Sequence, residues 1–338
     1  MKRTKILIIY TGGTIGMITE PSNSVLKPFD FDQITQEIPE LKKIKCSLDA
    51  VSFKNPIDSS NMNFASWKKM GDFIWKNYDN YDGFVVLHGS DTMAYSASAL
   101  SFMFRNLTKP IIFTGSQLPI GTIRTDGKEN LITAIEIAAA TKNNKPIIQE
   151  VAIYFEYQLY RANRTTKVSS EDFEAFKSFN YPTLAVAGIN IKYNYAALLS
   201  SNDQVQYFSK FDNSIGVIHL YPGMDFNMLE KQFNIENQRA IVLLTFGSGN
   251  APTAKKFLKI IKDNIFSGKF IVNLTQCNAG SVQQGKYETS SHLKDFGVTG
   301  AKDMTLEAVT TKLMLLLAEN NNLKELELAF NESISGEI

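Results

Sequence analysis

Seven short runs of mostly apolar, branched side chains recur along this chain and constrain its fold most strongly. They cover residues 6–10, 84–87, 111–113, 151–155, 215–220, 241–244 and 270–274. Because the runs are continuous rather than alternating, each predicts a strand that is buried on both faces. Between them, apolar side chains recur at helical spacing in residues 92–105, 127–141, 251–265 and 305–318. Strands that alternate with helices predict an α/β fold built from parallel βαβ units.

The chain length and one break in this rhythm predict two domains. The 338 residues, 44% of them hydrophobic, are enough for more than one core. Residues 190–213 interrupt the pattern with asparagines, serines and scattered tyrosines, and we interpret them as a linker. We therefore expect a larger N-terminal domain over residues 1–189, with a doubly wound, mostly parallel sheet. A smaller parallel α/β domain should cover residues 214–338.

Charge and cysteine content argue against several functional classes. The 35 basic and 34 acidic residues give a net charge of +1, which favours a small neutral or zwitterionic ligand over nucleic acid or an anionic membrane. Cys46 and Cys277 form no Cys-x-x-Cys pair, and the three histidines lie far apart in the sequence. We expect no disulfide framework, no metal and no cofactor.

The apolar runs also bear on localisation. The run at 6–10 is too short for the core of a signal peptide. No run approaches the roughly 20 apolar residues that span a bilayer. We therefore expect a cytoplasmic protein with no membrane association.

Polar side chains follow several runs, at the strand ends where ligands of open parallel sheets bind. The motif TGGTIG at 11–16 places Thr14 in a turn whose glycines permit a close approach of backbone to ligand. The motif HGSDT at 88–92 contributes Ser90 and Asp91 after the second run. The segments NPIDSS at 55–60 and TGSQ at 114–117 add further polar candidates, namely Asp58, Ser59, Ser60 and Ser116.

A hydroxyl group becomes a strong nucleophile only when a neighbouring base removes its proton. His88 is the one histidine near these segments, but it belongs to the strand end rather than to an obvious triad. Lys167, in the segment RANRTTK at 161–167, is the more plausible base. A partly buried lysine beside Asp91 could relay a proton from Ser90.

Each of these elements also has an ordinary structural explanation. The glycine turn before Thr14 could be only a tight connection between a strand and a helix. Ser90 and Asp91 could cap the helix that follows them, and the Asp58 segment could be a polar turn. A lysine such as Lys167 usually lies solvated on the surface. The functional interpretation therefore depends on the combination.

Together, TGGTIG at 11–16 and HGSDTMAY at 88–95 resemble the two signature motifs of bacterial-type L-asparaginases, and most closely those of the type I, cytoplasmic branch. The similarity runs through nearly the whole chain and includes residues 81–87, 114–119, 161–167, 249–252 and 273–277. It implies an amidohydrolase in which Thr14 attacks the side-chain amide of L-asparagine. Ammonia then leaves, and water hydrolyses the covalent ester.

The resemblance also implies roles for the other candidates. Ser90, Asp91 and Lys167 would form a second triad that assists proton transfer. The α-amino and α-carboxylate groups of the substrate would be held by Asp58, Ser59 and Asp91, and backbone N–H groups near Ser90 would form the oxyanion hole. Besides the catalytic Asp91, the residues expected to bind substrate are Asp58, Ser59, Ser60, Gly89, Ser116 and Asn250.

Family members are homotetramers built from close dimers, so the resemblance implies a homo-oligomer, either a dimer or a dimer of dimers. Asn250 would reach toward the active site of a neighbouring subunit. Some type I enzymes bind a second asparagine near the positions of Thr166 and Cys277, which makes these two residues candidates for an allosteric site. An arginine that such enzymes use there aligns with Leu244.

Two departures from the family pattern concern the reaction. Ser90 stands where the family usually has threonine, which keeps the hydroxyl group and loses a methyl group. The flap after the glycine turn normally carries a tyrosine that approaches the nucleophile, but residues 20–29 contain none.

Three alternatives therefore stay open. The chain could be a non-catalytic asparagine sensor, a glutaminase-type amidohydrolase, or the amidase subunit of a transfer-RNA amidotransferase. The last normally carries an extra N-terminal domain, whereas the first apolar run begins here at Ile6.

Overall fold

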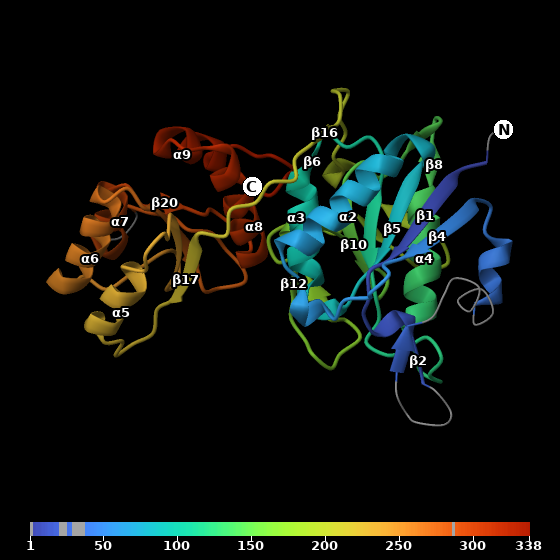
Figure 1. Ribbon diagram of the computed structural model, residues 1–338, viewed down its shortest axis with the longest axis horizontal. Coiled ribbons are helices and arrows are strands. Elements are labelled where there is room, and N and C mark those ends of the chain that lie inside the picture. Colours follow the sequence, from blue (N-terminus) through green and yellow to red (C-terminus); the bar gives the residue numbers. More distant parts are fainter. Residues whose placement is uncertain (1–2, 20–25, 29–37, 286–287) are drawn as a thin grey trace. The chain divides into compact units, whose positions relative to one another are not determined.

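The computed structural model describes residues 3–19, 26–28, 38–285 and 288–338 (Figure 1). The chain divides into two compact units, Met1–Ser209 and Lys210–Ile338, each with its own sheet. The domain boundaries expected at residues 189 and 214 stay predictions. Within 190–213, two short strands pair with strands of the first unit.

The first unit is built on an eight-stranded sheet. Its order is β15 (Lys192–Tyr193), β14 (Ala185–Val186), β11 (Gln158–Arg161), β10 (Val151–Phe155), β7 (Ile111–Thr114), β5 (Gly83–Leu87), β1 (Lys5–Tyr10) and β4 (Ser47–Ser52). All neighbours from β10 to β4 pair in parallel, whereas β11, β14 and β15 pair antiparallel. The parallel strands therefore end along one edge, where β1 and β5 lie side by side.

Helices cover both faces of this sheet, which explains why its central strands are apolar throughout. On one face, α4 (Gly127–Ala139) packs Leu131 and Ile135 into a cluster that contains Ile8 and Val85. The helices α2 (Phe64–Asn77) and α3 (Met93–Met103) lie beside each other, and α3 contacts β10 (Figure 1). Asn63 caps α2 by accepting from the N–H groups of its first turn.

The second unit has a smaller, entirely parallel sheet. Its order is β17 (Ile215–His219), β18 (Ala240–Thr245), β19 (Phe270–Thr275) and β20 (Thr299–Gly300). One core cluster joins this sheet to α5 (Phe226–Phe233), α6 (Lys255–Phe266) and α7 (Glu288–Phe296). In addition, α8 (Leu306–Glu319) contacts β17 and β18, and α9 (Leu323–Asn331) packs on α8.

Short two-stranded sheets and short 3₁₀ helices complete the described parts of the chain. The two-stranded pairs are β2 (Met17–Thr19) with β3 (Leu26–Pro28), β6 (Phe104–Arg105) with β16 (Gln206–Tyr207), β8 (Thr141–Lys142) with β9 (Lys145–Pro146), and β12 (Thr166–Lys167) with β13 (Phe176–Lys177). The 3₁₀ turns are η1 (Thr14–Gly16), η2 (Pro39–Lys43), η3 (Ser59–Asn61), η4 (Tyr78–Asn80), η5 (Ser90–Thr92), η6 (Ala162–Arg164) and η7 (Tyr195–Ala197).

The expected α/β class, with a large mainly parallel sheet and a smaller parallel one, is confirmed. Six of the seven apolar runs lie within strands, and the run at 215–220 extends one residue beyond β17. The four predicted helices correspond to α3, α4, α6 and α8. The apolar runs did not reveal β4 because this edge strand is half exposed. We find no helix in the described ranges with both the length and the apolar character needed to cross a bilayer.

Candidate active site

The strand β1 leads directly into the glycine turn that carries Thr14. Thr11 fixes the end of the strand, because its N–H and its Oγ1 both donate to the carbonyl oxygen of Leu87, at 3.0 and 2.9 Å. Gly12 and Gly13 then adopt φ values of +137° and +92°, which strongly favour residues without a Cβ atom. Thr14 follows as the first residue of η1 and is half-buried.

The same glycines let three chain segments pack backbone against backbone. A Cβ atom at Gly12 would lie 2.0 Å from the carbonyl oxygen of Ile57, and one at Gly13 would lie 2.4 Å from the nitrogen of Gly89. A Cβ atom at Gly89 would in turn lie 2.6 Å from Oγ of Ser59. The Thr14 turn, the 57–60 segment and the 88–92 segment therefore meet at the carboxyl ends of β1 and β5.

Tyr10, which the sequence interpretation did not single out, holds this turn through a hydrogen bond. Its hydroxyl donates a 3.2 Å hydrogen bond to the carbonyl oxygen of Gly13, directly before Thr14. Burial raises the pKa of Tyr10 to about 12, so the phenol stays a neutral donor near pH 7. In the sequence, Tyr10 could be recognised as the one residue with a hydroxyl group at the end of an aliphatic run.

Ser90, Asp91 and Lys167 form a connected polar network, although 76 residues separate Lys167 from Asp91 in the sequence. The Nζ atom of Lys167 donates to Oγ of Ser90 at 2.9 Å and to Oδ1 of Asp91 at 2.7 Å. The Lys167 side chain is 16% exposed, whereas that of Asp91 is 66% exposed. The hairpin of β12 and β13 thus presents a largely buried cation to a carboxylate that is still open to a ligand.

The 58–60 segment forms a turn in which Asp58 caps η3. Its Oδ1 accepts from the N–H and Oγ of Ser60, at 2.9 and 2.8 Å, and these bonds hold the pKa of Asp58 below its usual value. The carbonyl oxygen of Ser59 accepts from Oγ1 of Thr92 at 2.6 Å, which ties this turn to η5. Asp58 is exposed and anionic at neutral pH, whereas Ser59 is buried.

The loop after β7 contributes Gln117 rather than Ser116 to the polar network. Oγ of Ser116 is buried and makes no hydrogen bond to any described residue. Ser90 instead donates to Oε1 of Gln117 at 3.1 Å. The sequence interpretation quoted Gln117 within its motif but assigned it no role, because nothing local in the sequence predicts this contact.

His88 lies beneath Gly89 and is neutral. Burial lowers the pKa of His88 to about 4, although a hydrogen bond to the Gly89 carbonyl oxygen opposes this shift. Nδ1 lies 2.7 Å from that oxygen and therefore carries the proton of the neutral ring. The ring lies at an angle of 57° to that of Phe113, with the ring centroids 5.8 Å apart, and its Nε2 has no hydrogen-bond partner among the described residues. His88 holds the backbone and is unsuited to being a cation at neutral pH.

Three further residues were predicted for other roles. Thr166 precedes Lys167 in β12 and belongs to the first unit, whereas Asn250 and Cys277 belong to the second unit. Asn250 forms an antiparallel bridge with Phe246, and Cys277 has an exposed thiol. The roles proposed for these residues stay predictions. Of the flap segment 20–29, residues 20–25 and 29 lie outside the described residues.

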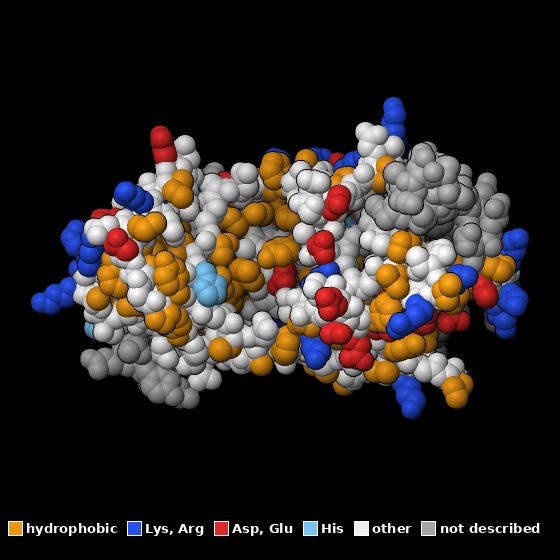
Figure 2. Space-filling model, turned by 90° about the horizontal axis from the view of Figure 1, so that it is seen from below, with side chains coloured by type: hydrophobic (Ala, Val, Ile, Leu, Met, Phe, Trp, Pro, Cys, Tyr) orange, Lys and Arg blue, Asp and Glu red, His pale blue; other side chains and the backbone are white. Residues whose placement is uncertain are grey.

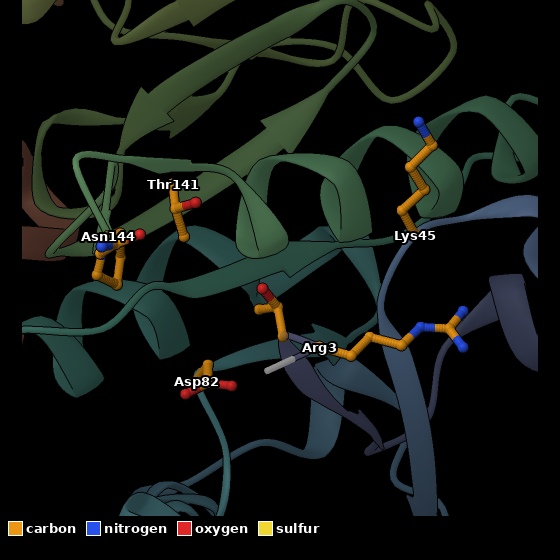
Figure 3. Close-up of a pocket in the computed structure, with 7 residues that line it drawn as sticks. Arg3, Lys45, Asp82, Thr141 and Asn144 are labelled. Carbon is orange, nitrogen blue, oxygen red and sulfur yellow. The ribbon is translucent and has the colours of Figure 1, made fainter. Parts of the chain in front are cut away.

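A separate pocket of about 890 Å³ lies at the opposite ends of the strands (Figure 3). Arg3, Asp82 and Lys45 line it, and each precedes a parallel strand rather than following one. Thr141 and Asn144 enter it from the β8–β9 hairpin (Figure 3). This pocket therefore does not belong to the site around Thr14. Within the described part of the chain, no group of three or more His, Cys, Asp or Glu residues is placed to hold a metal ion.

Comparisons with known proteins cover the chain almost completely. Residues 5–199 match the family model described as "Asparaginase, N-terminal", and residues 214–330 match the "Glutaminase/Asparaginase C-terminal domain". The L-asparaginase 1 of Escherichia coli (strain K12) is 38% identical over 340 residues, which covers 100% of this chain and 99% of that protein.

Solved structures show the same likeness. The L-asparaginase I of Vibrio cholerae superposes with a TM-score of 0.90 at 39% identity, and the match covers 100% of this chain and 99% of that one. The thermostable L-asparaginase of Thermococcus kodakarensis superposes with a TM-score of 0.91 at 30% identity and covers 99% of both chains.

Proposed function

Because this chain belongs to the asparaginase family, we propose that it is an L-asparaginase, an amidohydrolase that converts L-asparagine and water to L-aspartate and ammonia, with Thr14 as its nucleophile. One observation carries the assignment of the site. The turn that presents Thr14 packs through Gly13 against Gly89, directly beside the network of Ser90, Asp91 and Lys167.

The chemistry follows from these groups. Oγ1 of Thr14 adds to the carbonyl carbon of the substrate amide, and the bond from that carbon to nitrogen breaks as nitrogen takes up a proton and leaves as ammonia. The resulting β-aspartyl ester on Thr14 is then hydrolysed by water, which restores the hydroxyl group. Ser90 and Lys167 assist the proton transfers, and backbone N–H groups near Gly89 stabilise the developing oxyanion.

The charges around the site suit a zwitterionic amino acid. Asp58 is anionic at neutral pH and Asp91 is two-thirds exposed, so both carboxylates can face the α-ammonium group of a substrate. On the face drawn in Figure 2, Lys and Arg side chains are interspersed with acidic ones. With a net charge of +1, this distribution supports a small-molecule substrate rather than a nucleic acid or a membrane.

An asparaginase and a glutaminase belong to the same enzyme class and differ in which of the two amides they prefer. One additional methylene group changes binding by only about 1–3 kcal/mol in a closed pocket, so we expect 10- to 200-fold discrimination. Purified protein should release ammonia from L-asparagine with a higher kcat/KM than from L-glutamine. A higher kcat/KM for glutamine would reassign the substrate, and no ammonia from either amide would overturn the proposed function.

A non-catalytic asparagine sensor is the second candidate, because residues 20–29 lack the tyrosine that the family pattern places there. Calorimetry distinguishes the two functions. The enzyme should show a continuous heat of reaction that ceases when asparagine is consumed, whereas a sensor should show saturable binding heat and leave asparagine intact.

We also infer a cytoplasmic homo-oligomer in which Asn250 approaches the active site of a neighbouring subunit. Cys46 and Cys277 are both free thiols, which fits a reducing compartment. Light scattering coupled to gel filtration should give the mass of a dimer or a tetramer. A monomer that retains full activity would contradict the role proposed for Asn250.

A further inference from the structure

The side-chain amide of Gln117 connects Ser90 to the turn that follows β12. Its Oε1 accepts from Oγ of Ser90 at 3.1 Å, and its Nε2 donates to the carbonyl oxygen of Asp172 at 3.1 Å. A carbonyl oxygen can only accept, so the amide atom that faces Asp172 must be the nitrogen. The amide oxygen therefore faces Ser90, and this fixes the orientation of Gln117.

This orientation determines where the Ser90 proton points. The amide oxygen of Gln117 can only accept, so the Ser90 hydroxyl donates to it. The Lys167 ammonium can only donate, so a lone pair of the Ser90 oxygen accepts from Nζ at 2.9 Å. Ser90 thus rests with its oxygen toward Lys167 and its hydrogen toward Gln117.

Both ends of Gln117 are anchored. Its backbone N–H donates to both carboxylate oxygens of Asp126, at 3.1 and 2.9 Å, and Asp126 is buried. At the other end, the Asp172 N–H donates to Oγ of Ser169 at 2.9 Å, which holds the acceptor carbonyl within its own turn. Gln117 also lines a cavity of about 450 Å³ together with Asp172, so water can reach the amide side chain unless these bonds hold it.

A serine needs this support more than a threonine does. The second heavy atom on the Cβ of threonine restricts χ1, whereas the serine side chain lacks that restriction. We propose that Gln117 is a positioning residue that holds Ser90 in the χ1 rotamer that keeps its oxygen against Nζ of Lys167. This inference rests on the proposed function, and it assigns to Gln117 the orienting effect that a methyl group would supply.

A double-mutant cycle on the full-length protein tests the proposal. Gln117→Leu removes the amide at similar size, and it is made both alone and together with Ser90→Thr. Alone, it should lower kcat for asparagine by about tenfold, the rate equivalent of one neutral hydrogen bond, with a smaller change in KM. Together with Ser90→Thr, the loss caused by Gln117→Leu should shrink to less than about threefold, because the added methyl group restricts χ1.

Gln149→Leu serves as the matched control. The Gln149 amide also donates to a backbone carbonyl, that of Pro146, and it lies outside the active-site network. This variant should keep the activity of the unmodified protein. Equal losses in both Ser90 backgrounds, or no loss from Gln117→Leu, would overturn the inference while the unmodified protein still turns over asparagine. An inert unmodified protein would instead overturn the proposed function and this inference with it.

Discussion

The Nζ atom of Lys167 lies 2.7 Å from Oδ1 of Asp91, and it reaches this carboxylate from a side chain that is itself only 16% exposed. The two side chains differ in exposure, because that of Asp91 is 66% exposed. Water screens such a pair, so its contribution to stability is small. The ion pair matters for the geometry of the site, because it keeps the ammonium group of Lys167 against Ser90 and leaves the carboxylate of Asp91 open to a substrate.

Removal of this ammonium group should disable catalysis without unfolding the chain. Lys167→Met should lower kcat/KM for asparagine by about 10²- to 10⁴-fold, the range that a positioned proton-transfer group supplies. The matched control is Lys177→Met, since Lys177 lies exposed in the partner strand β13 of the same hairpin. Ammonia release gives the rates, and circular dichroism verifies folding. Equal activities for the two variants would show that the Lys167 ammonium group takes no part in the reaction.

A methyl group at Gly13 should both destabilise the protein and abolish activity. Gly13→Ala places a Cβ atom 2.4 Å from the nitrogen of Gly89 in a residue with φ of +92°. The steric clash should lower the free energy of unfolding by about 1–3 kcal/mol, and the unfavourable backbone conformation should lower it by about 1–2 kcal/mol more. Denaturant titration measures the total.

Gly223→Ala separates these two contributions. Gly223 has a similar φ of +84°, but no atom lies within 4 Å of the position of its Cβ. In this variant only the unfavourable backbone conformation should lower the free energy of unfolding, by about 1–2 kcal/mol, and the protein should stay active. If Gly13→Ala cost no more than this control and remained active, the close approach of the Thr14 turn to Gly89 would be unimportant.

Burial of His88 should make stability depend on pH. Its pKa is about 4 in the folded protein, against about 6.5 in an unfolded chain, so the unfolded state binds the proton more readily between these values. The free energy of unfolding should therefore fall as pH drops from about 6.5 toward 4, by up to about 1.4 kcal/mol per pH unit. NMR should show a His88 ring that stays neutral at pH 6. A protonated ring at that pH would contradict its assignment as a neutral backbone support.

A buried ion pair in the second unit links α8 to the C-terminal segment. Nζ of Lys312 lies 2.5 Å from Oε1 of Glu337, and both side chains are fully buried. Burial raises the pKa of Glu337, but Lys312 and the N–H groups of Ile334 and Ser335 outweigh it and hold the pKa below 4.5. This stabilisation should be present above pH 4.5 and disappear as pH falls through the lower folded value.

The substitution Glu337→Gln tests this ion pair by removing the charge of one partner. Glu337→Gln leaves the Lys312 cation buried, which should cost about 3–5 kcal/mol at pH 7 and less in acid. Denaturant titration at several pH values measures the difference. A cost that does not change with pH would mean that Glu337 is uncharged in the folded protein.

The sequence predicts the central strands and the strand-end residues because both depend on local patterns. Continuous apolarity marks β1 and β5, and the glycines around Thr14 and Ser90 follow them directly. Contacts between distant segments are harder to predict. The bond between Ser90 and Gln117 and the one between Tyr10 and Gly13 depend on tertiary packing that no local spacing encodes. Short antiparallel strands such as β14, with two residues, carry too little apolar pattern to be recognised.

Rapid-quench mass spectrometry can identify Thr14 as the nucleophile through its covalent intermediate. Wild-type protein mixed with L-asparagine and quenched in acid should carry the mass of one β-aspartyl group on the peptide that contains Thr14. Thr14→Ala should show neither adduct nor ammonia release, and Thr14→Ser should retain both at a reduced rate. An adduct on Ser90, or undiminished ammonia release by Thr14→Ala, would show that Thr14 is not the nucleophile.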